Sequence, residues 1–359
     1  MRAVVMRDQK LVVDDVPTPQ PGPGEVLVKT LACGICGSDL HTLKHAQKLV
    51  EISEKSGGAF NMDLKRDIVM GHEFCVEVLD HGPETGKTLK AGTRACSMPV
   101  LIRPAGVETV GYSNDNPGGY GELMRLTEGL LLEVPNGLST EYAALTEPLA
   151  VGYHAVQMAR LDKDDVPLVI GCGPVGLAVI AALRLKDVRP VVAADFSPRR
   201  RQLAEAMGAD VVIDPHQHSP YASWKEAAVA DPDTAPQQAP WATGPPLRPA
   251  VLFECVGVPG VIDQMMSAAP HGARIVVVGV CMENDTIQPM FGINKELNLQ
   301  FVLGYTREEF SQTLYNIADG KLPLEPLITG KVGVEGVAGA FEELASPERH
   351  AKILVEPWR

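Results

Sequence analysis

Three things are scarce in this sequence of 359 residues, and each scarcity excludes a class of protein. No uninterrupted apolar run approaches about 18 residues, so neither a membrane span nor a secretory signal is expected. No stripe rich in Lys and Arg offsets the net charge of −13, which argues against nucleic acid as a partner. Cysteine is sparse and odd in number, seven in all, which argues against a disulfide framework. We therefore expect a cytoplasmic protein whose thiols are reduced or bind metal.

The residues that are abundant predict a globular protein with an internal change of pattern. Because 45% are hydrophobic, the chain can bury large cores in about two or three domains. In its first part, short β-like runs alternate with turns, which is typical of a small β domain. These runs cover residues 3–6, 11–14, 26–31, 75–79 and 130–134. After Thr140 we expect a long connecting helix, which Pro148 should bend or interrupt.

The second part of the chain alternates apolar strands with helical segments. Such strands indicate a parallel sheet covered by helices on both faces, an α/β arrangement. The expected strands are 168–170, 191–194, 211–213, 251–254, 275–278 and 299–303. Residues 214–249, rich in proline and polar residues, are interpreted as a long surface excursion. A helix over 307–319 and a strand over 351–355 complete the prediction.

A glycine-rich loop between the first of these strands and an Ala/Leu-rich helix predicts a dinucleotide site. The loop reads Gly171-Cys172-Gly173-Pro174-Val175-Gly176. Its glycines permit a tight turn and close approach of the backbone to a pyrophosphate, whose charge the helix N-terminus meets. About 20 residues further on, Asp195 can accept hydrogen bonds from a ribose and repel a 2′-phosphate. NAD is therefore predicted rather than NADP, although three arginines follow closely. A glycine turn in a nucleotide-free domain is the simpler alternative.

Three segments carry side chains that suit a metal ion. They are Cys33-Gly34-Ile35-Cys36-Gly37-Ser38-Asp39-Leu40-His41, Gly71-His72-Glu73 and Thr146-Glu147-Pro148. Zn²⁺ accepts thiolate, imidazole and carboxylate, and a catalytic site needs about three protein ligands plus an open position. Taken singly, these residues would be explained as a core thiol, a turn serine, a helix-capping glutamate and hydrogen-bonded histidines. Their joint occurrence favours the metal.

In this order and over the whole chain, the motifs resemble those of the zinc-dependent alcohol and polyol dehydrogenases of the medium-chain dehydrogenase/reductase superfamily. The resemblance implies a GroES-like, β-rich catalytic domain over residues 1–150 and 296–359. It implies a doubly wound Rossmann NAD-binding domain over residues 151–295. It also implies one catalytic zinc per chain, hydride transfer between an alcohol and NAD, and homodimers or homotetramers paired near 275–278 and 299–303. A second, structural zinc is not expected, because Cys96 is the only cysteine in the segment where relatives carry four.

Carried over residue by residue, the resemblance assigns roles to this chain's own side chains. The metal residues implied are Cys36, His72, Glu73 and Glu147, with the two glutamates binding directly or through the metal's water. The catalytic residues implied are Ser38, which takes the substrate proton, His41, which passes it on through the nicotinamide ribose, and Glu147. Cys33 is not expected to bind, and Asp39 would orient local structure. The cofactor residues predicted are Gly171, Gly173, Pro174, Val175, Gly176, Asp195, Arg200, Val256, Val278, Gly279 and Val280.

The substrate and two alternative functions stay open. Glu147 at the third-ligand position favours a secondary alcohol or polyol, although neighbouring apolar residues would admit a terpenoid or aromatic alcohol. The interval from Cys36 to His72 is longer than usual, and its extra residues, around 47–64, border the substrate cleft in relatives. One alternative is a zinc-independent enone or quinone reductase on the same fold. The other is a catalytically silent nucleotide-binding protein, which fold alone does not exclude.

Overall fold

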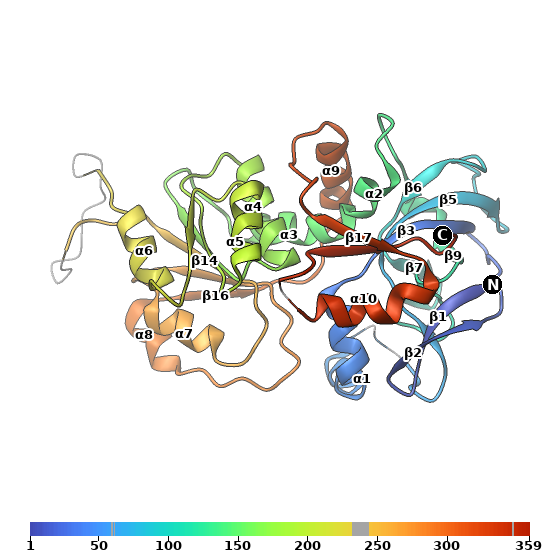
Figure 1. Ribbon diagram of the computed structural model, residues 1–359, viewed down its shortest axis with the longest axis horizontal. Coiled ribbons are helices and arrows are strands. Elements are labelled where there is room, and N and C mark those ends of the chain that lie inside the picture. Colours follow the sequence, from blue (N-terminus) through green and yellow to red (C-terminus); the bar gives the residue numbers. More distant parts are fainter. Residues whose placement is uncertain (59, 61, 232–243, 347) are drawn as a thin grey trace. The chain divides into compact units, whose positions relative to one another are not determined.

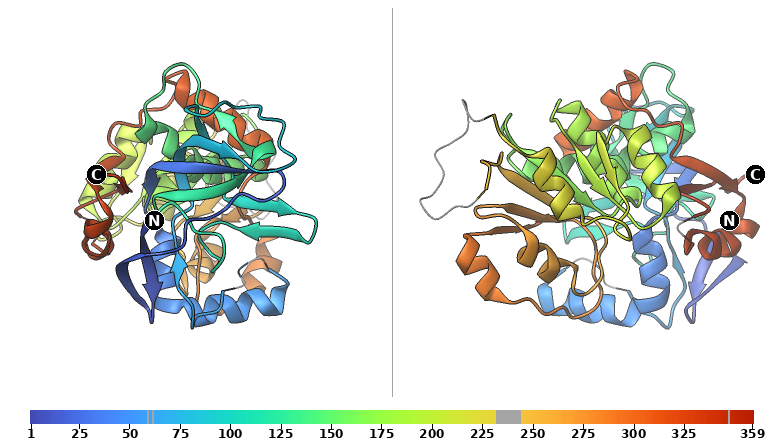
Figure 2. Two further views of the ribbon diagram at one scale, coloured as in Figure 1. Left: turned by 90° about the vertical axis from the view of Figure 1, so that its right-hand side faces the viewer. Right: turned by 60° about the vertical axis from the view of Figure 1, so that its left-hand side comes forward.

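The computed structural model describes residues 1–58, 60, 62–231, 244–346 and 348–359, and these form two compact units (Figure 1). Unit 1 comprises Met1–Pro148 and Thr306–Arg359, and unit 2 comprises Leu149–Tyr305. Both ends of the chain therefore belong to unit 1 (Figure 2). The domain boundary predicted from the sequence lies between residues 295 and 296. A boundary there would separate the strand Asn298–Phe301 from the sheet to which it is paired. Where the domains divide stays a prediction.

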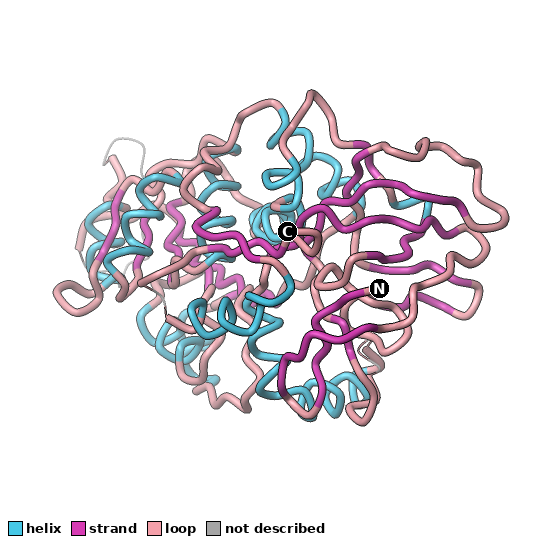
Figure 3. Tube along the Cα trace, turned by 45° about the vertical axis from the view of Figure 1, so that its right-hand side comes forward, coloured by secondary structure: helices cyan, strands magenta, loops and turns pink. Residues whose placement is uncertain are grey.

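Unit 1 consists mainly of strands, which Figure 3 shows in magenta. Its elements are β1 (Arg2–Arg7), β2 (Lys10–Asp15), β3 (Glu25–Gly34), α1 (Gly37–Ser56), β4 (Ile68–Val69), β5 (Glu73–His81), β6 (Arg94–Cys96), β7 (Val100–Arg103), β8 (Gly106–Thr109), β9 (Leu123–Thr127), η1 (Glu128–Leu130), β10 (Leu132–Glu133), α2 (Thr140–Ala144), α9 (Arg307–Ala318), β17 (Ile328–Val332), η2 (Val334–Gly336), α10 (Val337–Leu344) and β18 (Lys352–Val355). Within the described residues, the sheet orders are β2-β1-β4, β10-β6-β5-β3-β18-β17 with β9 also paired to β3, and β7-β8.

Strand β3 organises the largest of these sheets. It pairs antiparallel with β5, β9 and β18. Its alternate residues Val26 and Val28 are fully buried in the core of unit 1, as the two-residue period of a half-buried strand requires. Strand β18 comes from the far end of the chain, yet it lies between β3 and β17. The middle of the sheet is thus made by segments more than 300 residues apart.

Helix α1 occupies much of the segment that the sequence left unassigned. It runs from Gly37 to Ser56, with non-helical backbone angles at His45, and ends at Gly57 in the left-handed conformation. The first part of the predicted 47–64 excursion is therefore helical, and Ala46 and Ser53 are buried. The sequence missed this helix because its apolar residues are few and its period is interrupted at the kink.

Unit 2 is the predicted parallel sheet with helices on both faces. Its elements are β11 (Val166–Ile170), α4 (Pro174–Leu185), β12 (Val192–Ala194), α5 (Pro198–Met207), β13 (Val211–Ile213), α6 (Pro220–Ala227), β14 (Ala250–Glu254), α7 (Val261–Ala268), β15 (Arg274–Val277), α8 (Pro289–Lys295) and β16 (Asn298–Phe301). Among the residues described, the order is β13-β12-β11-β14-β15-β16, and all neighbours are parallel. Figure 1 shows α4 and α5 on one face and α7 and α8 on the other. The fold is doubly wound, because the chain reverses direction across the sheet after β13.

Two local expectations need correction. The connecting helix is interrupted at Leu145 rather than at Pro148, so that α2 is followed by α3 (Thr146–Met158). Pro148 lies in the first turn of α3, where a missing N–H costs nothing. The 214–249 excursion contains α6, whose Trp224 is buried and donates its indole N–H to Val166 O at 2.9 Å. The remainder of that prediction falls largely on residues 232–243, outside the described part.

None of the helices in the described part of the chain combines the length and the apolar character needed to span a bilayer.

Candidate active site

Three candidate metal ligands converge where β3, α1 and β5 meet. Cys36 caps the N-terminus of α1 just beyond β3, and His72 and Glu73 lie at the start of β5. Their sulfur, ring nitrogen and carboxylate oxygen all lie within 4.8 Å of one another. Gly34 permits this approach, because a Cβ there would lie 2.0 Å from Glu73 Oε2. The fold therefore brings these three predicted metal residues together.

A buried carboxylate lies behind His72. Asp39 is fully buried, and its Oδ1 lies 3.3 Å from His72 Nδ1. Burial opposes a charge on His72, but the charge of Asp39, together with Cys36, outweighs it and raises the pKa of His72 well above its ordinary value. Because Nδ1 faces Asp39, Nε2 is the nitrogen left for a metal, and metal-binding histidines usually have such a carboxylate partner.

Two tyrosines hold Asp39 in place. Tyr112 Oη donates to Asp39 Oδ1 at 2.9 Å, and Tyr120 Oη donates to Oδ2 at 2.6 Å. The backbone N–H of Cys36 donates to Oδ2 at 3.0 Å. Burial acts against ionisation of Asp39, yet His72 and these hydrogen bonds hold its pKa below the ordinary value. Burial and then the Asp39 charge raise the pKa of both tyrosines, so both hydroxyls keep their protons.

Glu73 has a buried cation as its partner. Lys352, from β18, places Nζ 2.7 Å from each Glu73 carboxylate oxygen and donates to Ile35 O at 3.0 Å. Both side chains are almost completely buried. Burial acts against the charge of Lys352, but the Glu73 and Cys36 charges outweigh it and raise the pKa of Lys352. The buried carboxylate thus has a lysine within hydrogen-bond distance of both its oxygens.

Glu147 lies close enough to influence the same lysine. It sits in the first turn of α3 and is 8% exposed. Its charge is among the causes that raise the pKa of Lys352. It is not part of the group whose ligand atoms lie within 4.8 Å of one another. The structure therefore brings Glu73 directly to Cys36 and His72, and Glu147 to the neighbourhood of their charge-balancing lysine.

The predicted proton-relay residues both lie on α1. Ser38 Oγ is hydrogen-bonded to Tyr112 Oη at 2.9 Å. His41 lies one turn further along the helix and is half-buried. Burial, and then the positive charges of His45 and Lys44, lower the pKa of His41 below 6.5. His41 is therefore uncharged, and able to accept a proton, at a lower pH than an ordinary histidine.

The chemistry of the donor set fits a zinc ion. One thiolate, one imidazole and one carboxylate supply three protein donors, which is the number that leaves a catalytic zinc one open position. Among the described residues, Cys36, His72 and Glu73 form the one group of three His, Cys, Asp or Glu side chains whose ligand atoms lie this close together. Cys33, by contrast, is fully buried in β3, and burial raises the pKa of its thiol well above the ordinary value. It packs as a core residue.

In unit 2 the glycine-rich loop has the geometry of a phosphate-binding turn. Gly173 is the N-cap residue of α4, and Pro174 occupies the first helical turn. A Cβ at Gly176 would lie 1.8 Å from Gly171 O, so the helix can approach the strand only with glycine at this position. Val175 follows in the first turn of α4. The arrangement of strand, glycine loop and helix N-terminus is the one that binds phosphate in dinucleotide-binding domains.

Asp195, just beyond β12, supports the same loop. Its Oδ2 accepts the N–H of Cys172 at 2.8 Å, and its Oδ1 accepts the N–H of Ser197 at 2.8 Å. Arg200 Nη1 lies 3.9 Å from Oδ2. Each carboxylate oxygen retains a further lone pair, so the ribose interaction predicted for Asp195 is compatible with these bonds. The sequence did not foresee that Asp195 also ties β12 to the glycine loop.

The other predicted cofactor residues follow the ends of β14 and β15. The side chain of Glu254 accepts the N–H groups of Val256 and Gly257 at 2.8 and 2.9 Å. The backbone carbonyl of Glu254 accepts the N–H groups of Val278 and Gly279. Apolar side chains remain exposed beside these loops, with Val256 at 41% and Val280 at 49%. The carboxyl ends of parallel strands are where α/β sheets bind ligands.

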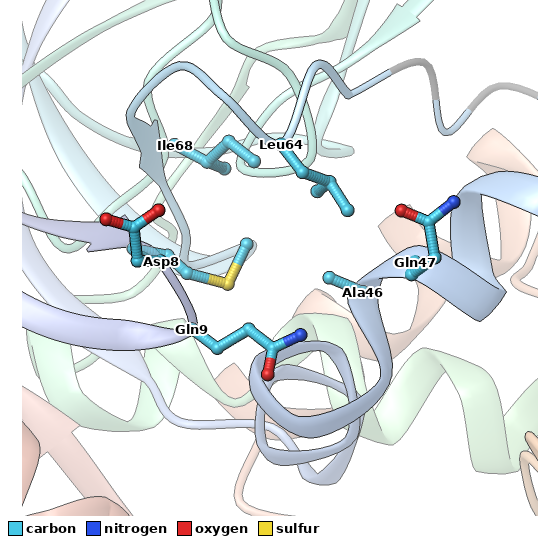
Figure 4. A pocket seen from close by; sticks show the side chains of 7 residues that line it. Asp8, Gln9, Ala46, Gln47, Leu64 and Ile68 are labelled. Carbon is cyan, nitrogen blue, oxygen red and sulfur yellow. The ribbon is translucent and has the colours of Figure 1, made fainter.

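A cavity of about 310 Å³ in unit 1 involves none of the predicted site residues. Figure 4 shows Leu64 and Ile68 on one side of it and Gln9 and Ala46 on the other. It lies beside the turn between β1 and β2 and the second half of α1. It is therefore distinct from the Cys36, His72 and Glu73 group.

Comparisons with known proteins agree with this geometry. Residues 22–136 match the alcohol dehydrogenase GroES-like domain, and residues 174–319 match the zinc-binding dehydrogenase family. The chain is 30% identical to (R,R)-butanediol dehydrogenase of Bacillus subtilis (strain 168), over 99% of this chain and all of that protein. It is 28% identical to sorbitol dehydrogenase of Bos taurus, over 92% and 89% of the two chains. The crystal structure of 2R,3R-butanediol dehydrogenase from Bacillus subtilis superimposes with a TM-score of 0.79 at 28% identity, covering 99% of each chain.

Sequence reasoning missed three residues of the site. The sequence could have indicated Lys352, because a charged residue within a predicted apolar strand needs a buried partner. It could not have indicated Tyr112 and Tyr120, because they lie in a glycine-rich stretch that shows no helix or strand periodicity. The predicted fold class is confirmed, with a GroES-like domain and a Rossmann-type parallel sheet. The chain belongs to the zinc-binding dehydrogenase family of medium-chain dehydrogenases, and it is an oxidoreductase that acts on CH–OH groups.

Proposed function

We propose that the enzyme reversibly oxidises a secondary alcohol or polyol with NAD, at one zinc ion held by Cys36, His72 and a carboxylate. The observation that carries the proposal is the group of these two residues with Glu73, backed by the buried Asp39. Glu73 is the first candidate for the third ligand because it is already within range, and Glu147 is the second. When bound, zinc supplies Lewis-acid stabilisation of an alkoxide.

The chain's own residues then have distinct tasks. Asp39 orients the His72 ring, and Lys352 pairs with the Glu73 carboxylate and holds it in place. Ser38 accepts the proton of the substrate hydroxyl, and His41 passes a proton towards solvent. In the overall reaction, one alcohol and one NAD⁺ give one carbonyl compound, one NADH and one proton. NAD, when bound, would supply the hydride acceptor, and the glycine loop and Asp195 would hold the pyrophosphate and ribose of the dinucleotide.

The substrate class is inferred from chemistry shared by the relatives. The two relatives are named after butanediol and sorbitol, and each of these compounds carries a secondary hydroxyl next to another hydroxyl. We propose that this enzyme also takes a vicinal diol or polyol. A screen with NAD of 2R,3R-butanediol, sorbitol, 2-butanol and an aromatic alcohol tests this. Oxidation confined to the aromatic alcohol would refute the polyol assignment.

The metal assignment has its own test. Metal analysis of the purified protein should give one zinc per chain, and Cys36→Ala should remove it together with NADH formation from the alcohol. Ser38→Ala should keep zinc but lower kcat by about 10²–10⁴-fold, as expected for loss of a general acid–base group. Unchanged zinc in Cys36→Ala would refute the site. Reduction of an enone by protein stripped of zinc would support the zinc-independent alternative instead.

We also propose a homodimer formed through the edge of the unit 2 sheet. Strand β16 is the last strand in the sheet order, so one edge of its backbone is left without a neighbouring strand in the described chain. Large apolar side chains on and beside it are exposed, with Phe301 at 61%, Leu303 at 84% and Ile293 on α8 at 70%. An exposed apolar edge strand is a site for pairing with another chain, and a second copy would bury it.

A further inference from the structure

Two buried carboxylates lie on either side of strand β11, at the carboxyl edge of the unit 2 sheet. Strands β12 and β14 are the two neighbours of β11, and both run parallel to it. Asp195 follows directly after β12, and Glu254 is the last residue of β14. Asp195 is 8% exposed and Glu254 is 1% exposed. Because a carboxylate is costly to bury, we expect Glu254 to do more than fill the core.

Glu254 joins the loop that follows β14 to the loop that follows β15. Its side-chain Oε1 accepts the N–H groups of Val256 and Gly257, at 2.8 and 2.9 Å. Its backbone carbonyl accepts the N–H groups of Val278 and Gly279, at 2.9 and 3.0 Å. One residue therefore supplies hydrogen-bond acceptors to both loops.

The two loops also pack backbone against backbone. A Cβ on Gly279 would lie 2.5 Å from Gly257 N and 2.7 Å from Glu254 Oε2. Gly257 has a φ of +72°, and a Cβ on it would lie 2.6 Å from Val280 O. Glycine is therefore required on both sides of this contact. Together with the hydrogen bonds of Glu254, the contact makes the loops one packed unit, on which the side chains of Val256 and Val280 remain exposed.

The positions of the two carboxylates match the two halves of a dinucleotide. A dinucleotide bound to a doubly wound sheet crosses it where the strand order reverses, which here is between β11 and β14. Its halves therefore lie on opposite sides of that point. The adenosine ribose is predicted to lie at Asp195, whose carboxylate also holds the glycine loop through the N–H of Cys172. The nicotinamide half then lies over the loops that Glu254 joins.

We propose that Glu254 is a positioning residue that holds residues 255–258 and 278–281 together as the platform for the nicotinamide half of NAD. The proposal rests on the proposed use of NAD. Glu254 acts through the backbone groups that it binds, and it need not touch the cofactor itself. Because its side-chain hydrogen bonds go to the loop after β14, removing the side chain should disturb one half of the dinucleotide site and leave the other half intact.

Two ligands distinguish the halves of the site. NADH carries the nicotinamide and is followed by its own fluorescence, whereas ADP-ribose lacks the nicotinamide and is followed by isothermal titration calorimetry. In Glu254→Ala, we expect the affinity for NADH to fall about 10- to 100-fold, because two hydrogen bonds to a carboxylate are lost. The affinity for ADP-ribose should stay within about 2-fold of the wild type, as expected for independent parts of a site. Retained binding of ADP-ribose also shows that unit 2 is folded.

Three further variants test whether the effect comes from the hydrogen bonds. Glu254→Gln keeps an oxygen that accepts the same two N–H groups, so it should recover most of the NADH affinity that Glu254→Ala loses. Asp195→Ala removes the carboxylate on the other side of β11 and should weaken NADH and ADP-ribose alike, since both contain the adenosine ribose. If Glu254→Ala does not fold, Glu254→Asp replaces it, because a side chain shorter by one methylene withdraws the carboxylate from the loop and should give the same selective loss.

Two results would overturn the inference and leave the proposed function standing. One is an affinity for NADH in Glu254→Ala, or in Glu254→Asp in its place, that equals the wild-type value. The other is an equal loss of affinity for NADH and ADP-ribose in that variant, which would make Glu254 a support of the whole unit. Wild-type protein that binds neither NADH nor ADP-ribose would instead refute the proposed use of NAD, and the inference with it.

Discussion

Replacing Lys352 by methionine should destabilise the metal-free protein strongly. The substitution keeps most of the aliphatic stem but removes the cation 2.7 Å from both oxygens of Glu73. Glu73 is fully buried, and Lys352 is 3% exposed. An unpaired carboxylate would then remain where water does not reach it. Removing one partner of a buried ion pair costs about 3–5 kcal/mol, and we expect a loss in that range for unfolding of unit 1.

Two further variants separate the buried charge from other effects of the substitution. Lys331→Met removes a lysine that pairs with Glu141 and Glu356, but its side chain is 34% exposed, so about 0–1 kcal/mol should be lost. The double variant Glu73→Gln with Lys352→Met leaves no charge unpaired and should be more stable than Lys352→Met alone.

Urea unfolding of EDTA-treated protein, followed by circular dichroism, measures these differences in the free energy of unfolding. Adding zinc should recover part of the stability of Lys352→Met, because a bound cation is a new partner for the freed carboxylate. If Lys352→Met loses no more than Lys331→Met, the ion pair does not stabilise the fold in the way described. If zinc stabilises the wild type and Lys352→Met equally, Glu73 does not lie close to the metal.

Three further predictions concern the cofactor, the proton relay and the assembly. The wild type should favour NAD, and Asp195→Ala should shift the ratio of kcat/KM values towards NADP; a wild type that favours NADP would mean that Arg200 dominates. His41→Gln should lower kcat modestly and mainly below neutral pH, because the lowered pKa of His41 keeps it a usable base there, and added imidazole should restore part of the rate. A uniform loss without rescue would contradict the relay. Leu303→Asp should convert a dimer to monomers in light scattering, and an unchanged mass would contradict pairing through β16.

The sequence predicts the nucleotide unit well because each of its elements follows from local patterns. Strands inside a parallel sheet are continuous apolar runs, and β11, β12, β13, β14 and β15 fall where such runs were found. Strand β16, at the edge of the sheet, overlaps the predicted run although much of it is exposed. The glycine loop is equally local, since the steric demand at Gly176 comes from Gly171, within the same turn. Periodicity and turn chemistry therefore suffice in this part of the chain.

The site in unit 1 is only partly predictable. Cys36, Ser38 and His41 lie in one segment, and His72 and Glu73 are adjacent, so motifs find them. The residues that hold them in position are brought from elsewhere by the fold. Tyr112 and Tyr120 reach Asp39 across 73 and 81 residues, and Lys352 reaches Glu73 across 279. No pattern in one sequence specifies such pairings, because they depend on strand order rather than on spacing.

Strand β18 ties closure of the active site to pairing between distant parts of the chain. The strand carrying Lys352 lies between β3 and β17, and Lys352 meets Glu73 across 279 residues of sequence. Contacts of such long sequence separation carry a large entropic cost of loop closure, so they form slowly. We therefore expect Cys36, His72 and Glu73 to gain their buried cation only in a late step of folding, when β18 pairs with β3.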